Sequence, residues 1–362
     1  MTMEPIDRQA AFTGTKSVAD ALKFNEAGLV GWLERHVEGF SGPVRLTQFK
    51  GGQSNPTYLV ETDGPAYVLR RKPPGKLLPS AHAIDREYRV MAALGKAGFP
   101  VPKVFGLCED ETVIGTAFYV MARIDGRILW EPDLPDCPKA ERAAIYDAMN
   151  ATLAQLHGFD PEALGLGDYG KPANYVARQI ARWSRQYEDS KTEQIDAMDR
   201  LIAWLPGRVP ESGPARIVHG DFRLDNLILA PDAAQVRAVL DWELSTLGDP
   251  VADFTYHCMQ WHMPRSKTGA GVGSLTGHDL ADLGIPDLDT YMAAYERRTG
   301  FSVSEHSDFY FAYNFFRLAA ILQGIVGRVR DGTATNENAA AMASQIPPLA
   351  ETAWRFAGKA GA

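Results

Sequence analysis

The stretch His219-Gly220-Asp221-Phe222-Arg223-Leu224-Asp225-Asn226 decides the fold, together with Asp241 a short way downstream. Short apolar runs at 216–218 and 227–229 predict β-strands on both sides of this stretch. A further strand, predicted at 236–240, ends at Asp241, so a loop and a hairpin separate the two acidic positions. This strand–loop–strand–strand–Asp arrangement is specific, whereas a short motif alone can occur by chance.

Phosphoryl transfer needs a group that orients or deprotonates the acceptor hydroxyl, and metal ions that neutralise phosphate charge. Protein kinases supply that group from an H-R-D-x-x-x-x-N loop, and the corresponding residue here is Asp221. The hard oxygen ligands of Asn226 and Asp241 suit Mg²⁺. We interpret His219 as a structural brace of the loop and not as a proton carrier. The alternative interpretation is that 219–221 forms a simple turn and that Asp241 is a surface cap.

The first third of the chain predicts a small sheet that carries one helix. The apolar pattern indicates a helix at 84–94 and strands at 45–50, 57–60, 67–69 and 117–121. A glycine turn joins the first two strands, and we expect its backbone N–H groups to cover phosphates. The turn consists of Gly51, Gly52, Gln53 and Ser54.

The third predicted strand and the helix contain the candidate nucleotide contacts. Alternation along the strand places Val68 and Arg70 on one face, where Val68 would pack on adenine and Arg70 would reach the phosphates. Glu87 falls on the apolar stripe of the helix, so we expect Arg70 to pair with it, the alternative being a solvated charge. The phosphate contact has two rivals, Arg71 and Lys72. In the hinge between the lobes, we expect backbone groups of Met121, Ala122 and Ile124 to contact adenine.

Beyond residue 125 the pattern becomes mostly helical. Helical spacing occurs at 141–157, 173–187, 193–204, 290–299 and 308–329. We therefore divide the chain into a nucleotide-binding lobe, 1–125, and a catalytic and acceptor-binding lobe, 126–362. The apolar stretch 309–329 contains polar and charged residues, which favours a buried helix over a membrane span.

Composition and charge exclude several classes of function. A net charge of -8 argues against a nucleic-acid partner, which usually selects a basic face. Three scattered cysteines form no CxxC pair, so a disulfide framework or a zinc site is not expected, and a reducing compartment fits best. The acidic stretch 1–14 does not resemble a signal peptide, and we expect a cytoplasmic protein with no membrane partner.

Two glycine patterns could suggest other nucleotide folds. Residues 165–170 match the spacing G-x-G-x-x-G, but they follow a helix end and no βαβ unit surrounds them, so we predict a loop. The pattern G-x-x-x-x-G-K-[ST] is absent from the sequence, which excludes a P-loop kinase.

From about Phe49 to Tyr256 the sequence resembles the aminoglycoside phosphotransferase family, which shares the fold of choline kinases and protein kinases. Within that family it looks most similar to the kinase-like domains related to acyl-CoA dehydrogenases. The closer match lies in 67–75, 241–243 and the segment Gly248-Asp249-Pro250-x-x-Asp253. The resemblance implies an α+β, two-lobe fold with a small antiparallel sheet in the N-lobe and a larger, mainly helical C-lobe. It also implies an ATP-dependent small-molecule kinase that uses Mg²⁺, in which Asp249 and Asp253 are structural.

Departures from protein kinases are informative. Gly220 stands where protein kinases have the arginine that pairs with a phosphorylated activation loop. Only a few residues separate Asp241 from the segment at 248–250, which leaves no room for such a loop. We therefore expect an enzyme that is not switched by loop phosphorylation.

The acceptor is less constrained by the sequence. Arg178, Arg182 and Arg185 share one face of a predicted helix, and the resemblance implies that this region borders the acceptor cleft. Positive charge there favours an anionic acceptor, such as a hydroxyacyl-CoA, although a solvated basic face is the alternative. The predicted acceptor-binding residues are Arg178, Arg182, Trp183, Glu243 and His257.

Three functions stay open at this point. The first is a kinase for a hydroxyacyl-CoA or another anionic acceptor, with an acyl-CoA dehydrogenase as a pathway partner. The second is an aminoglycoside kinase or a choline or homoserine kinase with the same catalytic residues. The third, of another class, is a nucleotide-binding pseudokinase that serves as an interaction module.

Overall fold

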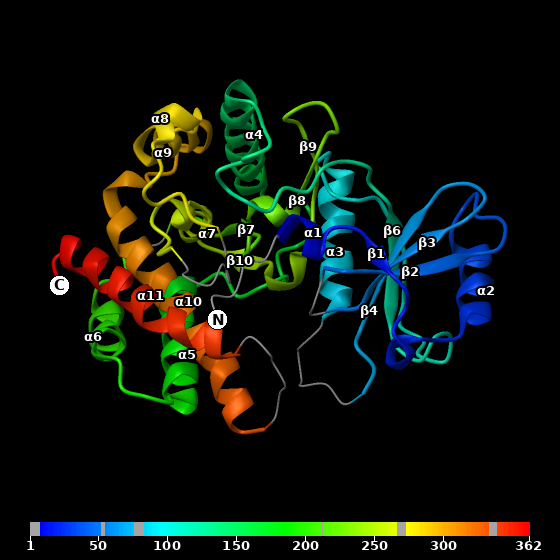
Figure 1. Ribbon diagram of the computed structural model, residues 1–362, viewed down its shortest axis with the longest axis horizontal. Coiled ribbons are helices and arrows are strands. Elements are labelled where there is room, and N and C mark those ends of the chain that lie inside the picture. Colours follow the sequence, from blue (N-terminus) through cyan, green and yellow to red (C-terminus); the bar gives the residue numbers. More distant parts are fainter. Residues whose placement is uncertain (1–7, 52–54, 76–82, 212, 266–272, 333–338) are drawn as a thin grey trace.

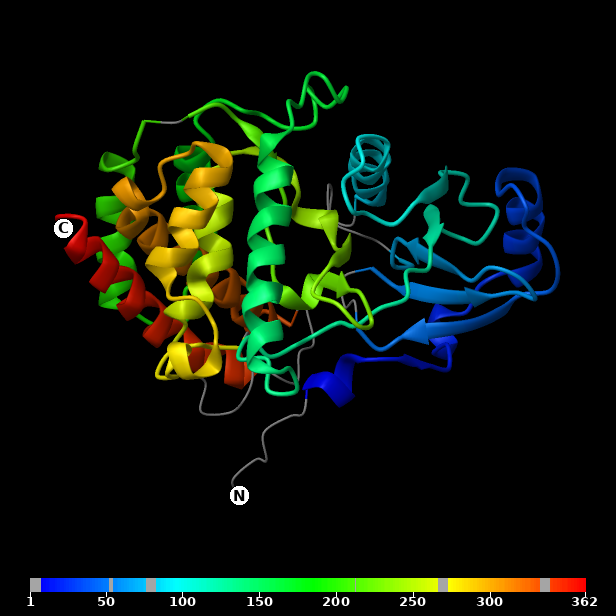
Figure 2. The same cartoon turned by 90° about the horizontal axis from the view of Figure 1, so that it is seen from above.

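The computed structural model describes residues 8–51, 55–75, 83–211, 213–265, 273–332 and 339–362. A sheet-containing lobe and a helical lobe lie side by side (Figure 1), and the same division is visible from above (Figure 2). The last strand of the sheet lobe ends at Ala122, and the first long helix of the other lobe starts at Lys139. The fold is therefore of the α+β class, with a small antiparallel sheet preceding a mainly helical lobe.

The N-lobe contains a six-stranded sheet in the order β1-β2-β3-β4-β6-β5, and every neighbouring pair is antiparallel. Its strands are β1 (Thr15–Lys16), β2 (Arg45–Phe49), β3 (Thr57–Glu61), β4 (Tyr67–Arg71), β5 (Val104–Cys108) and β6 (Phe118–Ala122). The helices of this lobe include α2 (Glu26–His36) and α3 (Ile84–Lys96). Strands β1 and β5 were not expected from the sequence.

Alternation along the strands gives the sheet two apolar faces. Leu69 of β4 packs in one cluster with α2, whereas Val68, its neighbour in sequence, belongs to a second cluster that contains α3 and the C-lobe core. Arg70 shares the face of Val68, as the alternation predicts, so its side chain is directed toward the junction of the lobes.

The C-lobe is mainly helical. Helices α5 (Tyr175–Ser190), α6 (Asp196–Trp204), α7 (Pro250–His257) and α11 (Ala339–Lys359) pack against α10 (Ser307–Arg330), and α4 (Lys139–Gly158) packs against α9 (Leu288–Thr299). The short helix α8 (Leu280–Leu283) precedes α9. By length and composition α10 could also cross a membrane, but 72% of its most apolar window is buried inside the fold. The burial supports the prediction of a core helix at 308–329.

Two small ribbons hold the catalytic segment in the C-lobe. Strand β7 (Arg216–Val218) pairs with β10 (Thr246–Gly248), and β8 (Leu227–Leu229) pairs with β9 (Val236–Val239). The segment 219–226 therefore leaves one ribbon and enters the other, in the loop position that the sequence predicts. The pattern at 165–170 lies in turns, again as predicted.

A short N-terminal helix, α1 (Arg8–Phe12), crosses from one lobe to the other. Residues after it form β1, which pairs with β2 of the sheet. Gln9 of α1 donates to the carbonyl of Ile128 at 3.1 Å, and the ring of Phe12 lies 5.0 Å from that of Trp130. We call residues 8–16 the N-terminal strap, because they contact both lobes across their junction (Figure 1).

Candidate active site

The catalytic loop, residues 219–226, is fixed by a buried carboxylate. Asp253, in the first turn of α7, accepts hydrogen bonds from the backbone N–H groups of His219 at 2.7 Å and Gly220 at 2.8 Å. Burial alone would raise the pKa of Asp253, but hydrogen bonding and the proximity of His157 hold it below its ordinary value. Asp249 caps the same helix by accepting from the N–H of Val251 at 2.8 Å. Both aspartates thus occupy structural positions.

His219 is held at both ring nitrogens. Its Nε2 contacts the carbonyl of Leu240 at 2.8 Å, and its Nδ1 accepts the backbone N–H of Asp221 at 3.2 Å. A carbonyl can only accept, so the proton is on Nε2. The ring therefore ties the catalytic loop to the strand end before Asp241, the arrangement of a brace.

Both carboxylate oxygens of Asp221 have neighbours in the structure. Its Oδ1 accepts the hydroxyl of Tyr256 at 2.7 Å and lies 3.7 Å from Nε of Arg223. The amide of Asn226 donates to the backbone carbonyl of Asp221 at 2.9 Å and to its Oδ2 at 3.3 Å. Tyr256 was not singled out from the sequence, because it lies 35 residues further along the chain.

Gly220 is required by two independent features of the loop. Its φ is +84°, and a Cβ added there would lie 2.7 Å from the carbonyl oxygen of Leu244. We expect Gly220→Ala to lower the free energy of unfolding by about 2–4 kcal/mol, since it combines a left-handed backbone with a clash. Gly115→Ala is the matched control, because Gly115 has a φ of +89° and open space around it. That variant should lose about 1–2 kcal/mol in urea unfolding, and an equal loss in both would contradict the clash.

A buried ion-pair network links β4, α3 and the segment after β9. Nε of Arg70 lies 3.0 Å from Oε2 of Glu87, and its Nη2 lies 2.8 Å from Oδ1 of Asp241 and 3.6 Å from Oε2 of Glu243. Glu87 also accepts hydrogen bonds from Tyr119 and Asn55, each at 3.0 Å.

The network contains the predicted pair, Arg70 and Glu87. It also contains Tyr119 and Asn55, which the sequence did not reveal. Arg70 is 7% exposed and Glu87 is 1% exposed, so both charges are removed from bulk water. Burial raises the pKa of Glu87, and the positive charge of Arg70 opposes that effect. Asp241 adopts the left-handed conformation, with φ +63°, which is uncommon for a residue other than glycine.

A cavity of about 390 Å³ lies between the lobes. Arg70, Asn226 and Asp241 line it, together with the apolar side chains of Val68, Met121, Ile228 and Leu240. Ala122, Ile124 and Gly51 also line it, whereas Gly52, Gln53 and Ser54 lie outside the described residues. Most of the predicted nucleotide contacts therefore meet around one cavity, and Glu87 reaches it through Arg70.

The rival cations point elsewhere. Arg71 donates to the hydroxyl of Tyr58 at 3.1 Å and to the carbonyl of Leu22 at 3.0 Å, on the α2 face of the sheet. Neither Arg71 nor Lys72 lines the cavity. Of the three candidates, Arg70 is the one that lines the cavity.

The hinge backbone offers a hydrogen-bond donor at Ile124. The N–H groups of Ala122 and Arg123 are hydrogen-bonded to the carbonyls of Lys103 and Ala66, at 2.8 and 3.4 Å. Within the described ranges, the N–H of Ile124 has no such partner. Because Ile124 lines the cavity, this donor can serve a ligand.

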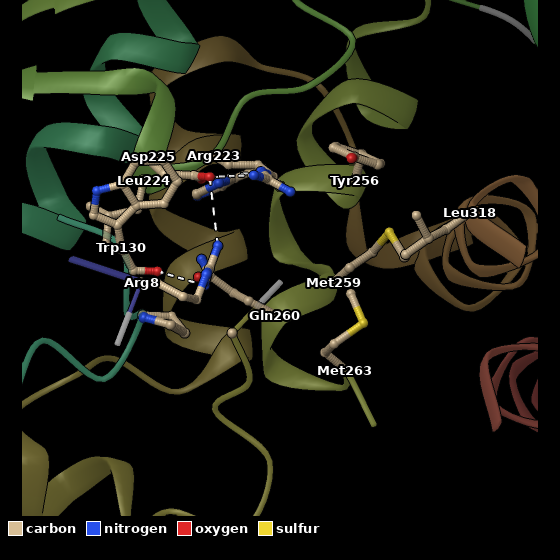
Figure 3. Close-up of a pocket in the computed structure, with 13 residues that line it drawn as sticks. Arg8, Trp130, Arg223, Leu224, Asp225, Tyr256, Met259, Gln260, Met263 and Leu318 are labelled. Carbon is tan, nitrogen blue, oxygen red and sulfur yellow. Dashed lines mark hydrogen bonds and ion pairs between the residues drawn. The ribbon is translucent and has the colours of Figure 1, made fainter. Parts of the chain in front are cut away.

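A second, smaller cavity of about 50 Å³ adjoins the catalytic loop (Figure 3). Its polar wall contains Arg8, Arg223 and Asp225, and its apolar wall contains Met259, Met263 and Leu318. Arg8 comes from the N-terminal strap: its Nη1 donates to the carbonyl of Trp130 at 3.0 Å, and its Nη2 lies 3.8 Å from Oδ2 of Asp225.

Tyr256 lines the smaller cavity and donates to Asp221, which is not itself among the residues that line either cavity. His257 also lines the smaller cavity, and burial lowers the pKa of His257 to about 4, so the ring is neutral at neutral pH. Trp130 and Asp225 line both cavities, so the two cavities share part of their walls.

The basic face of α5 lies apart from this arrangement. Arg178, Arg182 and Arg185 line one groove, of about 590 Å³, between α5 and α10, which agrees with the predicted shared face. No residue lining that groove lines the cavity beside Asp221. The indole of Trp183 donates to Gln179 of its own helix at 3.1 Å. The structure thus does not bring Arg178, Arg182 or Trp183 to the catalytic loop, whereas it does bring His257 and places Glu243 near Arg70.

Comparison with known proteins gives a consistent picture. Residues 45–302 match the family model described as the phosphotransferase enzyme family. Acyl-CoA dehydrogenase family member 10 of Mus musculus is 46% identical over 334 residues, which are 91% of this chain and 31% of that protein. This chain thus spans about a third of the length of that relative.

Solved structures show the same fold. A candidate aminoglycoside phosphotransferase from Ralstonia eutropha JMP134 is 50% identical, with a TM-score of 0.85 over 93% of this chain and 99% of that chain. A spectinomycin phosphotransferase, solved in complex with ADP and spectinomycin, has a TM-score of 0.61 at 10% identity and covers 92% of this chain and 98% of its own. The latter likeness concerns the fold alone.

Proposed function

The chain belongs to the phosphotransferase enzyme family, and we propose that it is a kinase that transfers the γ-phosphoryl group of ATP to a hydroxyl of a small molecule. One observation carries this proposal. Asp221 is hydrogen-bonded to Asn226, which lines a cavity with Arg70 and Asp241 at the junction of the lobes. That set contains the carboxylate, the metal ligands and the phosphate cation that phosphoryl transfer requires.

The larger cavity suits a nucleotide. Adenine would pack between Val68 and Met121 on one side and Ile228 and Leu240 on the other. The N–H of Ile124 would donate to the edge of the base. The phosphates would extend toward Arg70, under the turn that begins at Gly51.

The residues at the inner end of this cavity fit Mg²⁺. Asn226 and Asp241 offer hard oxygen atoms there, and the described residues hold no cluster of three or more His, Cys, Asp or Glu side chains. Such a sparse set suits Mg²⁺, which usually takes one or two protein ligands and completes its shell with phosphate and water. Bound there, Mg²⁺ would neutralise charge on the phosphates.

Asp221 then acts on the acceptor. Its carboxylate orients the hydroxyl and takes its proton as the hydroxyl oxygen bonds to the γ-phosphorus. The bond from the γ-phosphorus to the bridging oxygen breaks, and ADP leaves with that electron pair. Asp221 returns the proton to solvent before the next cycle.

The smaller cavity favours an acceptor with an anionic or carbonyl group and an apolar chain. Arg8 and Arg223 would face the polar part, and Met259, Met263 and Leu318 would contact the chain. A polycationic aminoglycoside would meet two arginines there, although Asp225 in the same wall pairs with both of them. The names of the acyl-CoA dehydrogenase relatives also support a hydroxyacyl-CoA, with such a dehydrogenase as the proposed pathway partner. A cytoplasmic location stays a prediction.

An ATP-consumption screen tests the proposal. Mg-ATP would be incubated with hydroxyacyl-CoAs, aminoglycosides and amino alcohols, and ADP would be measured with and without each compound. We expect ADP release with a hydroxyacyl-CoA, and turnover of kanamycin or choline alone would favour the second function. ATP that stabilises the protein against heat without any ADP release would instead indicate a pseudokinase.

A further inference from the structure

Tyr256 connects the catalytic carboxylate to the helical core. It lies in the last turn of α7, and its hydroxyl donates to Oδ1 of Asp221 at 2.7 Å. Burial raises the pKa of Tyr256, so the phenol keeps its proton and acts as a donor at neutral pH. Figure 3 shows its ring at the edge of the smaller cavity, next to Arg223.

Arg317 packs against the ring of Tyr256. This arginine of α10 is 7% exposed, and its guanidinium carbon lies 5.0 Å from the centroid of the Tyr256 ring. Its Nη2 donates to the carbonyl of Gly220 at 2.9 Å. Among the described residues no carboxylate lies within 4.0 Å of Arg317, and its Nε has no hydrogen-bond partner. Burial opposes the charged form of Arg317, but nearby tyrosines and the Asp221 carboxylate hold its pKa above the ordinary value, so Arg317 faces Asp221 from beyond ion-pair distance.

We propose that Tyr256 is a positioning residue that holds Oδ1 of Asp221 and leaves Oδ2 directed at the acceptor hydroxyl. Arg317 contacts both the Tyr256 ring and the carbonyl of Gly220. It therefore fixes the position of the Tyr256 hydroxyl relative to the catalytic loop. The inference rests on the proposed role of Asp221. Among the described residues, the cations that face Asp221 are Arg223 of its own loop and Arg317 of α10, and Tyr256 is the phenol that donates to it.

Tyr256→Phe tests the inference in Mg-ATP turnover with water as the acceptor. Loss of a hydrogen bond to a charged group should lower kcat about 10- to 100-fold and leave the KM for ATP within about twofold. A crystal structure of the variant should show the Asp221 carboxylate rotated or in two orientations.

Tyr310→Phe is the matched control. Tyr310 also donates its hydroxyl to a carboxylate, Oδ2 of Asp249, at 2.7 Å, but it does not contact the catalytic loop. Both variants should lose similar thermal stability, and Tyr310→Phe should keep the parent kcat and the parent orientation of the Asp221 carboxylate. Equal effects of the two variants on kcat, or a Tyr256→Phe variant with the parent kcat and carboxylate orientation, would overturn the inference. The carboxylate orientation is read without turnover, so an inactive parent protein would sink the proposed function and not this inference.

Discussion

Replacement of Asp221 by asparagine is expected to abolish phosphoryl transfer while Mg-ATP still binds. Asparagine keeps the size of the side chain and an oxygen that accepts from Tyr256, but it cannot take a proton from the acceptor. Loss of a positioned general base typically lowers the rate by about 10²–10⁴-fold. Steady-state kinetics would show a fall in kcat, and calorimetric titration with Mg-AMP-PNP would show an affinity close to that of the parent.

The control for this variant is Asp232→Asn, which removes one exposed carboxylate from the turn between β8 and β9. It should keep the parent kcat, because Asp232 is exposed in that turn and lies outside both the catalytic loop and the residues that line the cavities. If Asp221→Asn retained more than about a tenth of the parent kcat, Asp221 would not be the base and the proposed mechanism would be wrong.

Arg70→Met is expected to have the largest effect on stability. The substitution leaves Glu87 buried with two neutral donors, Tyr119 and Asn55, and no cation. Breaking a buried pair on one side costs about 3–5 kcal/mol, because the remaining charge is uncompensated. Urea unfolding should show this loss at neutral pH. Mg-ATP affinity should fall as well, since Arg70 is the cation at the inner end of the cavity.

Two further variants identify the cause. Adding Glu87→Gln to Arg70→Met removes the stranded charge, so the double variant should recover much of the lost stability. Arg70→Lys keeps a positive charge and should be intermediate, because lysine cannot span Glu87 and Asp241 with a planar fork. A single Arg70→Met variant as stable as the parent protein would rule out the ion pair as a stabilising feature.

The parts of the site that follow local periodicity could be predicted from the sequence. Period-two alternation along β4 placed Val68 and Arg70 on the cavity side, and the apolar stripe of α3 placed Glu87 inside. The strands around the catalytic loop also lie where short apolar runs predicted them. In each case the deciding information lies within a few residues of the position concerned.

The parts that depend on packing between distant segments could not be predicted. Arg8 meets Asp225, and Arg317 meets Gly220, across more than ninety residues of sequence. The helix α11 was also missed, because Pro347 and Pro348 lie inside it and proline argues against a helix interior.

The basic face of α5 shows the limit of helical periodicity. The spacing of Arg178, Arg182 and Arg185 correctly predicts that they share a face. It does not tell which neighbour that face meets, because this depends on how α5 packs against α10. The structure directs it to a groove away from the catalytic loop.

Asp253 has a consequence for the timing of the reaction cycle. One carboxylate fixes two consecutive N–H groups of the catalytic loop, so the loop loses its conformational freedom when the C-lobe folds and not each time a substrate arrives. In the proposed kinase, the movement that admits ATP and releases ADP would then come from the sheet lobe and the N-terminal strap. In such an enzyme we expect separation of the lobes, and not the chemical step, to limit kcat.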